Sequence, residues 1–202
     1  MRQVLIAAIR ANYSLFNVEL NDDAIDRLAD YYEFVQEHNE LLHLIGPCQP
    51  DEFATRHILE SLTLLEYLPK GSKFADVGAG AGLPSIPCLI VREDLTAILI
   101  ESKAKKAEFL QGAVVRLGMK DRAEIVNLQF EEGFPGDAEF VTCRALDKFT
   151  QQLPRLLRWS KKRTLLLFGG PTIGAEMRRL GRRIEEKLMP LSERRYLFIS
   201  NA

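Results

Sequence analysis

Three glycines alternate with alanines directly after a short apolar run in residues 74–87, FADVGAGAGLPSIP. Gly78, Gly80 and Gly82 have no Cβ, so the chain there can turn with positive φ and a ligand can lie against bare backbone. A strand that enters such a turn and a helix that leaves it form the first nucleotide-binding turn of a doubly wound fold. The stretch predicts a cavity for a nucleotide-like cofactor, with an ordinary glycine-rich turn as the alternative.

The spacing of these glycines distinguishes between cofactors. A dinucleotide fingerprint, G-x-G-x-x-G, would need glycine where this chain has Leu83, and no Gly-Lys-Ser/Thr follows as in a Walker loop. Asp76, two residues before the first glycine, would repel a pyrophosphate and suits a cation such as a sulfonium. The pattern D-x-G-x-G-x-G resembles the first motif of class I S-adenosylmethionine-dependent methyltransferases. This resemblance implies S-adenosylmethionine as methyl donor and S-adenosylhomocysteine as product.

A second acidic residue, Glu101, ends the apolar run at 96–101 and lies 25 residues after Asp76. In a doubly wound fold, an acidic residue at the end of the second strand binds ribose hydroxyls through charge-assisted hydrogen bonds. Glu101 also directly precedes a helical pattern, so a role at the start of that helix is the alternative.

Hydrophobic periodicity predicts a helical N-terminal extension over residues 1–70, because apolar residues recur there at steps of three and four. The residues expected to share a helix face are Ile25, Leu28, Tyr32 and Val35, after Asn21 as N-cap, and Ala54, Ile58, Leu62 and Leu65 in a second helix that begins near Asp51. Residues 71–202 are expected to form a Rossmann-like methyltransferase domain.

In that second part, short apolar runs alternate with helical patterns. Strands are expected at 73–77, 96–101, 123–127, 139–144 and 163–168, and helices at 84–91, 103–117, 148–158 and 172–183. The tail has two extended runs around residues 190–193 and predicts a closing hairpin. This alternation is typical of an α/β fold, with a doubly wound, mostly parallel sheet covered on both faces.

Composition limits where the protein is expected to act and what it is expected to bind. The sequence has neither a run of eighteen apolar residues nor a signal segment, which predicts a cytoplasmic protein with no membrane partner, and we expect a monomer. Its three cysteines, Cys48, Cys88 and Cys143, are too few and too scattered for a disulfide framework or a C-x-x-C metal site. No metal is therefore expected, and the cysteines are interpreted as reduced packing residues.

The net charge of −1 hides a gradient along the chain. Residues 1–70 carry a formal charge of −7, residues 71–150 carry −2, and residues 151–202 carry +8. The basic residues are Arg155, Arg158, Lys161 to Arg163, Arg178, Arg179, Arg182, Arg183, Arg194 and Arg195, among others. Such asymmetry favours one face that binds phosphate, as in a nucleic-acid partner, although solvated helix faces would give the same pattern.

Two other classes of methyltransferase are disfavoured. Enzymes that methylate an adenine amine would be expected to show N-P-P-Y or D-P-P-Y after the fourth strand, where this chain reads VTCRALD. Residues 47–49, Pro-Cys-Gln, resemble the nucleophile motif of cytosine-C5 methyltransferases. That triplet lies about thirty residues before the cofactor loop, between two expected helices, so we interpret it as a turn.

Several segments together resemble one family over nearly the whole chain. The segments are NELLHLIGPCQPDEFATRHILESLTLLEYLP, FADVGAGAGLPSIPCLIV, ESKAKKAEFLQ, QFEEGFP and VTCRAL. In order and spacing they are similar to the bacterial small-subunit ribosomal RNA guanine-N7 methyltransferases, also called the glucose-inhibited division protein B family. The most specific pieces are residues 56–62 and Gly-Leu-Pro-x-Ile-Pro at 82–87. The resemblance implies methyl transfer to N7 of one guanosine in the 530 loop of 16S RNA, as free RNA or in the small ribosomal subunit.

The same resemblance implies roles in cofactor binding. Gly78 and Leu83 would line the methionine side, Glu101 the ribose, and Phe130 and Glu131 the adenine. Each has a plainer alternative: Leu83 and Phe130 are also ordinary core residues, and Glu131 is also an ordinary solvated loop acid.

Three further residues would face the substrate. Arg144, at the end of the fourth strand, would lie near the cofactor and the target base as the catalytic candidate, because a strand-end arginine is well placed for ligands. An interior ion pair is its alternative role. Arg56 and His57 are candidates for substrate binding, with a solvated helix surface as the alternative.

The chemistry of this reaction needs no general base. Guanine N7 has an in-plane lone pair and no proton to lose, so attack on the methyl group needs orientation more than proton transfer. Asp76 could interact with the cation, and an arginine could hold phosphate or the O6 of guanine. The base must be splayed out of its loop, which favours a shaped RNA target over a simple duplex.

The chain departs from the family pattern at three places: His43 where relatives commonly have Asn, Gln129 where they often have Arg, and Gly169 where the fifth strand commonly ends in Lys-Gly. These changes leave two alternatives open beside an RNA methyltransferase. One is a small-molecule methyltransferase on the same fold, which the acidic N-terminal part would allow. The other is a non-catalytic relative that binds S-adenosylmethionine or RNA.

Overall fold

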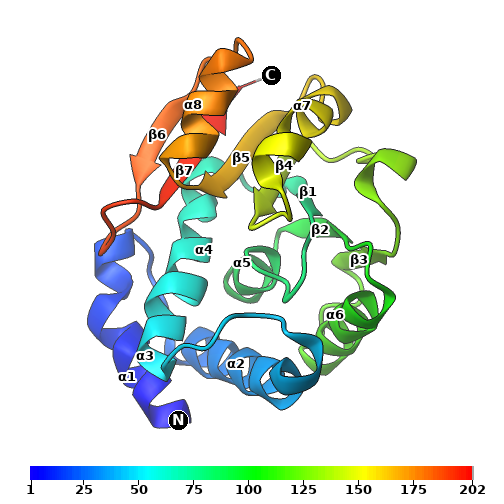
Figure 1. Cartoon of the computed structure of the whole chain (residues 1–202). Coiled ribbons are helices and arrows are strands. Elements are labelled where there is room, and N and C mark those ends of the chain that lie inside the picture. The colour runs from blue at the N-terminus through cyan, green and yellow to red at the C-terminus, as the bar shows by residue number, and fades with distance from the viewer. Residues whose placement is uncertain (202) are drawn as a thin grey trace.

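A single twisted sheet, shown in Figure 1, forms the centre of the computed structural model, which describes residues 1–201. Within those residues, seven strands lie in the order β3-β2-β1-β4-β5-β7-β6. They are β1 (Lys73–Val77), β2 (Thr96–Ile100), β3 (Ala123–Val126), β4 (Phe140–Arg144), β5 (Thr164–Gly169), β6 (Glu185–Leu188) and β7 (Tyr196–Ser200). The first five are parallel, and β7 runs antiparallel to both β5 and β6. The predicted fold class, with its closing hairpin, is confirmed.

The strand order defines where a ligand can bind. Chain progression runs outward through β2 and β3 on one side of β1 and through β4 and β5 on the other. The connections after β1 and β4 therefore diverge at their carboxyl ends, and ligands of open α/β sheets bind at such a switch point. The central strands are buried over nearly their whole length, as parallel strands covered on both faces require.

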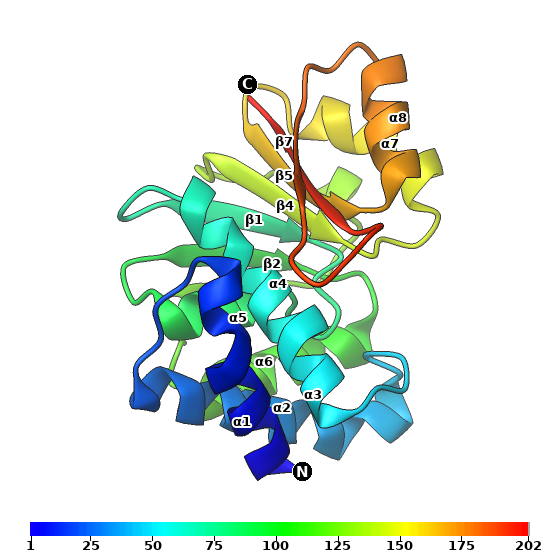
Figure 2. The same cartoon turned by 90° about the vertical axis from the view of Figure 1, so that its left-hand side faces the viewer.

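Helices cover both faces of the sheet, as Figure 2 shows from the side. They are α5 (Ser85–Val91) and α6 (Ala104–Arg116) on one face, and α7 (Phe149–Trp159) and α8 (Pro171–Arg179) on the other. The helix predicted over 172–183 ends earlier, at Arg179, because Gly181 takes a left-handed conformation with φ of 78°. No helix within residues 1–201 is both long and apolar enough to cross a membrane.

The N-terminal helices extend the core on the α5 and α6 side. They are α1 (Arg2–Asn12), η1 (Tyr13–Phe16) and α2 (Asp22–Leu42). Outside this N-terminal part, a short 3₁₀ turn, η4 (Phe130–Glu132), follows β3. The predicted N-cap is confirmed, since the Asn21 side chain accepts a hydrogen bond of 2.8 Å from the Ala24 N–H. Ile25, Leu28, Tyr32 and Val35 are all buried, as predicted. One apolar cluster contains these side chains together with those of α5 and α6.

The second N-terminal helix differs from the prediction of a single α-helix. The run consists of α3 (Pro50–Glu52), a π-helical segment η2 (Phe53–Leu59), α4 (Glu60–Leu62) and a 3₁₀ segment η3 (Thr63–Tyr67). The Glu60 N–H donates to the Thr55 carbonyl, five residues back. In an α-helix it would donate to the Arg56 carbonyl, which here accepts a hydrogen bond from Arg144 of β4. A contact with the sheet therefore accompanies the π-turn, a feature common at functional sites.

Candidate active site

A cavity of about 340 Å³ lies at the carboxyl ends of β1, β2 and β4. Its lining comes from the loop after each of these strands and from two N-terminal segments. The lining residues are Leu44, Ile45, Gly46, His57, Gly78, Ala79, Gly80, Ala81, Leu83, Glu101, Ser102, Lys103, Lys106, Arg144, Ala145, Leu146 and Asp147. The structure thus brings together six of the predicted site residues. We call this space the cofactor cavity.

The three glycines of the loop have different surroundings. Gly78 and Gly80 line the cavity in left-handed conformations, with φ of 72° and 54°. A Cβ on Gly80 would meet only the Gly78 carbonyl oxygen, at 3.7 Å, so it would project into open space that bare backbone leaves to a ligand. Gly82 lies outside the lining, and a Cβ there would collide with Ile86 at 2.3 Å. Gly82 therefore allows α5 to pack against its own loop.

Glu101 is buried with its carboxylate at the edge of the cavity. One oxygen accepts from the Gly80 N–H at 3.0 Å and the other from the Lys103 N–H at 2.8 Å. An ionised carboxylate offers about four acceptor positions, so positions remain for ligand hydroxyls after these two bonds. Glu101 thus ties the glycine loop to β2 and presents an acceptor to the cavity.

Asp76 occupies a different position from the one expected of a pocket acid. Its side chain is fully buried below the loop, is not part of the lining, and accepts a hydrogen bond of 2.5 Å from the Ser85 hydroxyl. Its other oxygen has no hydrogen-bond partner among residues 1–201. The pKa of Asp76 is raised to about 7, mainly by burial; the hydrogen bonds from Ser85 oppose this shift, and the nearby charge of Glu101 adds to it. Asp76 thus supports the start of α5, and its role in cofactor binding stays a prediction.

Arg144 connects the end of β4 to the N-terminal helical run. Its guanidinium donates to the Arg56 carbonyl at 2.5 Å, to Glu60 Oε2 at 3.2 Å and to Ser61 Oγ at 3.3 Å. Glu60 is 2% exposed, and its other oxygen accepts from Arg195 Nε at 2.6 Å. Arg144 therefore has an interior ion pair and also lines the cofactor cavity, so both roles considered from the sequence are compatible with its position.

Of the two substrate-binding candidates, His57 lies in the cavity wall and Arg56 does not. Burial, together with the positive charges of Arg144 and Arg56, lowers the pKa of His57 to about 3, so its ring is neutral at pH 7. Its Nδ1 has no hydrogen-bond partner among residues 1–201. Arg56 is exposed and forms an ion pair with Glu52.

The expected adenine-binding residues lie outside the cavity lining. Phe130 is buried, with its ring edge-on to Trp159 at 5.6 Å between centroids. Glu131 forms an ion pair with Arg155 at 3.3 Å. Their role in adenine binding stays a prediction. Leu83, by contrast, lies in the lining as expected.

Three residues at the site were not predicted from the sequence. Tyr31 of α2 is fully buried, and its hydroxyl donates a hydrogen bond of 2.9 Å to the Ala81 carbonyl in the glycine loop. Lys103 and Lys106 bring positive charge to the cavity wall. The helical periodicity of α2 could identify Tyr31 only as a core residue, because its polar contact is 50 residues away in the sequence.

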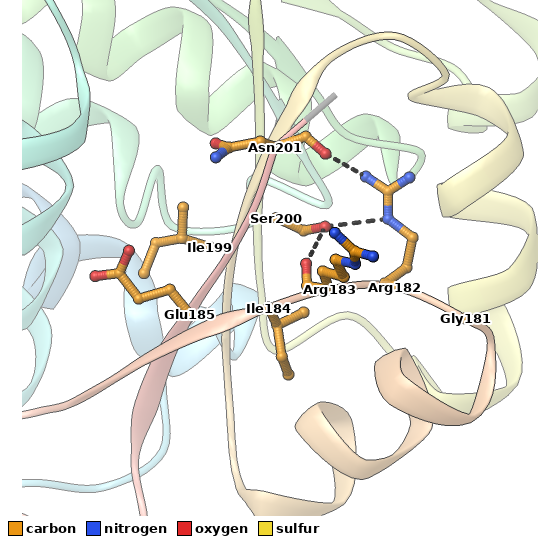
Figure 3. Close-up of a pocket in the computed structure, with 8 residues that line it drawn as sticks. All are labelled: Gly181, Arg182, Arg183, Ile184, Glu185, Ile199, Ser200 and Asn201. Carbon is orange, nitrogen blue, oxygen red and sulfur yellow. Dashed lines mark hydrogen bonds between the residues drawn. The ribbon is translucent and has the colours of Figure 1, made fainter.

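A larger hollow of about 470 Å³ lies elsewhere, between the turn after α8 and the end of β7 (Figure 3). In it, Arg182 donates to Ser200 Oγ at 3.1 Å and to the Asn201 carbonyl at 2.8 Å. Ser200 pairs with Leu165, near the start of β5, so this hollow is at the amino ends of the parallel strands. It therefore lies at the opposite end of the parallel strands from the cofactor cavity. None of the predicted site residues line it.

Comparison with known proteins gives a consistent result. The sequence model of the GidB family, described as rRNA small subunit methyltransferase G, matches residues 24–187. A relative from Sorangium cellulosum named ribosomal RNA small subunit methyltransferase G is 35% identical over 74% of this chain and 65% of the relative. One of the same name from Neisseria meningitidis serogroup C is 32% identical over 68% of this chain and 66% of the relative. The chain thus spans just under two thirds of the length of these relatives.

Solved structures agree on the fold. A protein of the NADB-Rossmann superfamily from Streptococcus agalactiae superposes with a TM-score of 0.57 at 16% identity, over 70% of this chain and 67% of its own. The B. subtilis M1A22 tRNA methyltransferase TrmK gives a TM-score of 0.53 at 18% identity, over 70% and 65%. At these identities the structures show the fold alone. Because the family model covers most of the sequence and relatives are 32% and 35% identical to it over 68% and 74% of its length, the chain belongs to the rRNA small subunit methyltransferase G family.

Proposed function

We propose that this chain transfers a methyl group from S-adenosylmethionine to N7 of a guanine in the 530 loop of 16S ribosomal RNA. The observation that carries the proposal is the cofactor cavity, in which a bare glycine loop, a buried strand-end carboxylate and a strand-end arginine meet. Family membership supports the RNA substrate, and the sequence resemblance supports the guanine N7 position.

The cavity residues fit the methyl donor. When bound, S-adenosylmethionine supplies a methyl group on a sulfonium cation. Gly80 leaves room for it against backbone, Gly78 lines the same cavity, and Glu101 has acceptor positions free for two ribose hydroxyls. Leu83 and Leu146 give apolar wall on either side of the loop.

The residues around Arg144 orient the substrate. N7 has no proton to lose, and the sulfonium's positive charge passes to the purine, so the site has to align the reacting atoms and keep water out. Three acceptors hold the Arg144 guanidinium in place. Because it is already fixed, no conformational entropy is lost in ordering it when the substrate binds. A guanidinium in that position binds the O6 of guanine or a phosphate. His57, neutral beside it, adds no competing positive charge.

The experiment that tests this proposal is methyl transfer in vitro. The purified chain is incubated with radiolabelled S-adenosylmethionine and either small ribosomal subunits or free 16S RNA from a strain that lacks modification in the 530 loop. Borohydride and aniline cleavage then maps N7-methylguanine. We expect one new cleavage site, in the 530 loop.

Two results would contradict the proposal. Label that enters RNA at another position would refute the 530-loop assignment while leaving an RNA methyltransferase. Binding of S-adenosylmethionine in calorimetry without transfer to either RNA would favour a small-molecule substrate or a non-catalytic role. A control with Gly80→Val, which fills the cofactor cavity, identifies any label that arises without this site.

A further inference from the structure

A second cavity lies beside the first, at the carboxyl ends of β4 and β5. It has a volume of about 290 Å³ and shares one wall with the cofactor cavity, formed by residues 144–146. Ligand pockets usually measure about 300–1,000 Å³, so this space suits a single ring system rather than a whole cofactor. A group held in it would lie across the shared wall from the contents of the cofactor cavity.

Aromatic side chains form much of this second cavity. Phe149 is the first residue of α7 and Tyr196 the first of β7, and both are half-buried. Phe168 of β5 is buried in the same lining, with the Arg144 guanidinium 5.5 Å from its ring centroid. Aromatic rings in a small cavity stack nucleobases once these have been unstacked from their RNA.

Charged groups are confined to one side of the second cavity. Glu60, Arg144 and Arg195 all line it, and the Glu60 carboxylate is paired with both arginines. Each arginine occupies only one acceptor position of the Glu60 carboxylate. The carboxylate can therefore still accept hydrogen bonds from N–H groups of a ligand. Guanine offers such donors at N1 and N2, whereas adenine presents an acceptor at N1.

The chain that follows β4 is also conformationally strained. Ala145 and Lys148, which follow β4, both adopt left-handed conformations, with φ of 54° and 49°. Non-glycine residues take this conformation at a cost, and such strain concentrates at active sites and ligand clamps. Here it turns the chain sharply between the two cavities and directs Phe149 into the second one.

We propose that the second cavity receives the purine base to be methylated, stacked against Phe149 and Tyr196, with N7 toward the shared wall and its N–H donors toward Glu60. This assignment rests on the proposed function, which supplies the guanine. It adds the place of the base and the residues that select it. The base reaches the cavity only after extrusion from its loop, which fits an opening at the sheet edge.

The test is a comparison of two phenylalanines. Phe149→Ala removes the stacking face, and Phe134→Ala removes a phenylalanine that is 73% exposed and lines neither cavity. Phe149→Leu keeps apolar volume without an aromatic face and carries the test if the alanine variant does not fold. Each variant is assayed for kcat/KM with small ribosomal subunits and for binding of S-adenosylmethionine by calorimetry.

We expect Phe149→Ala to lower kcat/KM by about tenfold or more, the size of one lost base-stacking contact, and to leave the cofactor Kd within about twofold. Phe149→Leu should lie between it and the wild type, and Phe134→Ala should match the wild type. Wild-type kcat/KM in both Phe149 variants would overturn the inference and leave the proposed function standing. A wild-type chain that transfers no methyl to RNA would instead overturn the proposed function, and the inference with it.

Discussion

The two halves of the carboxyl edge are held by different forces. Around β1 and β2, the cofactor cavity is shaped by backbone: Glu101 accepts from the Gly80 and Lys103 N–H groups, 21 and 2 residues away in the sequence. Around β4 and β5, the second cavity is shaped by charged side chains. Glu60 binds Arg144 and Arg195, from which it is separated by 84 and 135 residues.

This difference has an energetic consequence. A cavity shaped by the absence of side chains is damaged mainly by added volume. A cavity shaped by a buried charge network is damaged when one charge loses its partner, because the remaining charge stays buried without compensation. Substitutions in the two halves should therefore affect different measurements, cofactor affinity in the first and turnover in the second.

The largest effect is expected for Gly80→Val. A branched side chain at a φ of 54° is strained, and its atoms project into the cofactor cavity. We expect no measurable binding of S-adenosylmethionine by calorimetry. Gly118→Val is the matched control, because Gly118 has a similar φ of 68° and no atom within 4 Å of an added Cβ. If both variants lose binding alike, backbone strain and not cavity filling is the cause.

Arg144→Ala tests the other half. Turnover should fall by at least about 100-fold, as for other losses of a preorganised donor, while the affinity for S-adenosylmethionine changes little. The free energy of unfolding should fall by only about 1–3 kcal/mol, because Glu60 keeps its contact with Arg195. Urea unfolding and steady-state kinetics measure the two effects. Wild-type turnover together with lower stability would make Arg144 a structural ion-pair partner alone.

The pH dependence of stability tests the role of Asp76, the buried acid below the glycine loop. The pKa of Asp76 is about 7 in the folded chain, against an ordinary value of 3.8, mainly because of burial. A raised pKa means that its stabilising contribution is complete below pH 4 and is lost as pH rises to about 7, a loss on the order of 4 kcal/mol. Asp76→Asn should remove this slope. Unfolding free energies measured from pH 4 to 8 that run parallel for both proteins would refute the assignment.

The same contrast explains what could be predicted from the sequence. The cofactor half depends on local features, so the glycine pattern and the acid at the end of the next strand were sufficient to predict that Gly78, Gly80 and Glu101 would meet. The strand positions and the mostly parallel sheet followed from alternating patterns that each need only a few neighbouring residues. Asp76 belonged to the same motif, yet no pattern linked it to Ser85, whose hydroxyl donates a hydrogen bond to its buried carboxylate.

The surroundings of Arg144 and the second cavity could not be predicted in this way. The partners of Arg144 come from a helix far away in the sequence, and the π-helical segment that presents them has no signal in hydrophobic periodicity. Phe149 and Tyr196 are each unremarkable in sequence and share a cavity only because α7 and β7 begin at the same edge. Long-range contacts of this kind depend on the whole fold, whereas motif resemblance transfers only the residues inside the motif.

The smallest expected effect is at the contact between the N-terminal helices and the glycine loop. Tyr31→Phe removes a buried hydroxyl and leaves the Ala81 carbonyl without its donor, which should cost about 1–2 kcal/mol of unfolding free energy. Tyr32→Phe is the matched control, because the Tyr32 hydroxyl makes only a 4.0 Å contact with the Met1 sulfur. Since Ala81 lines the cofactor cavity, Tyr31→Phe should also weaken S-adenosylmethionine binding a fewfold, measured by calorimetry. Equal affinity in both variants would mean that β1 and β2 hold the loop without help from α2, and that the cofactor half is independent of the N-terminal helices.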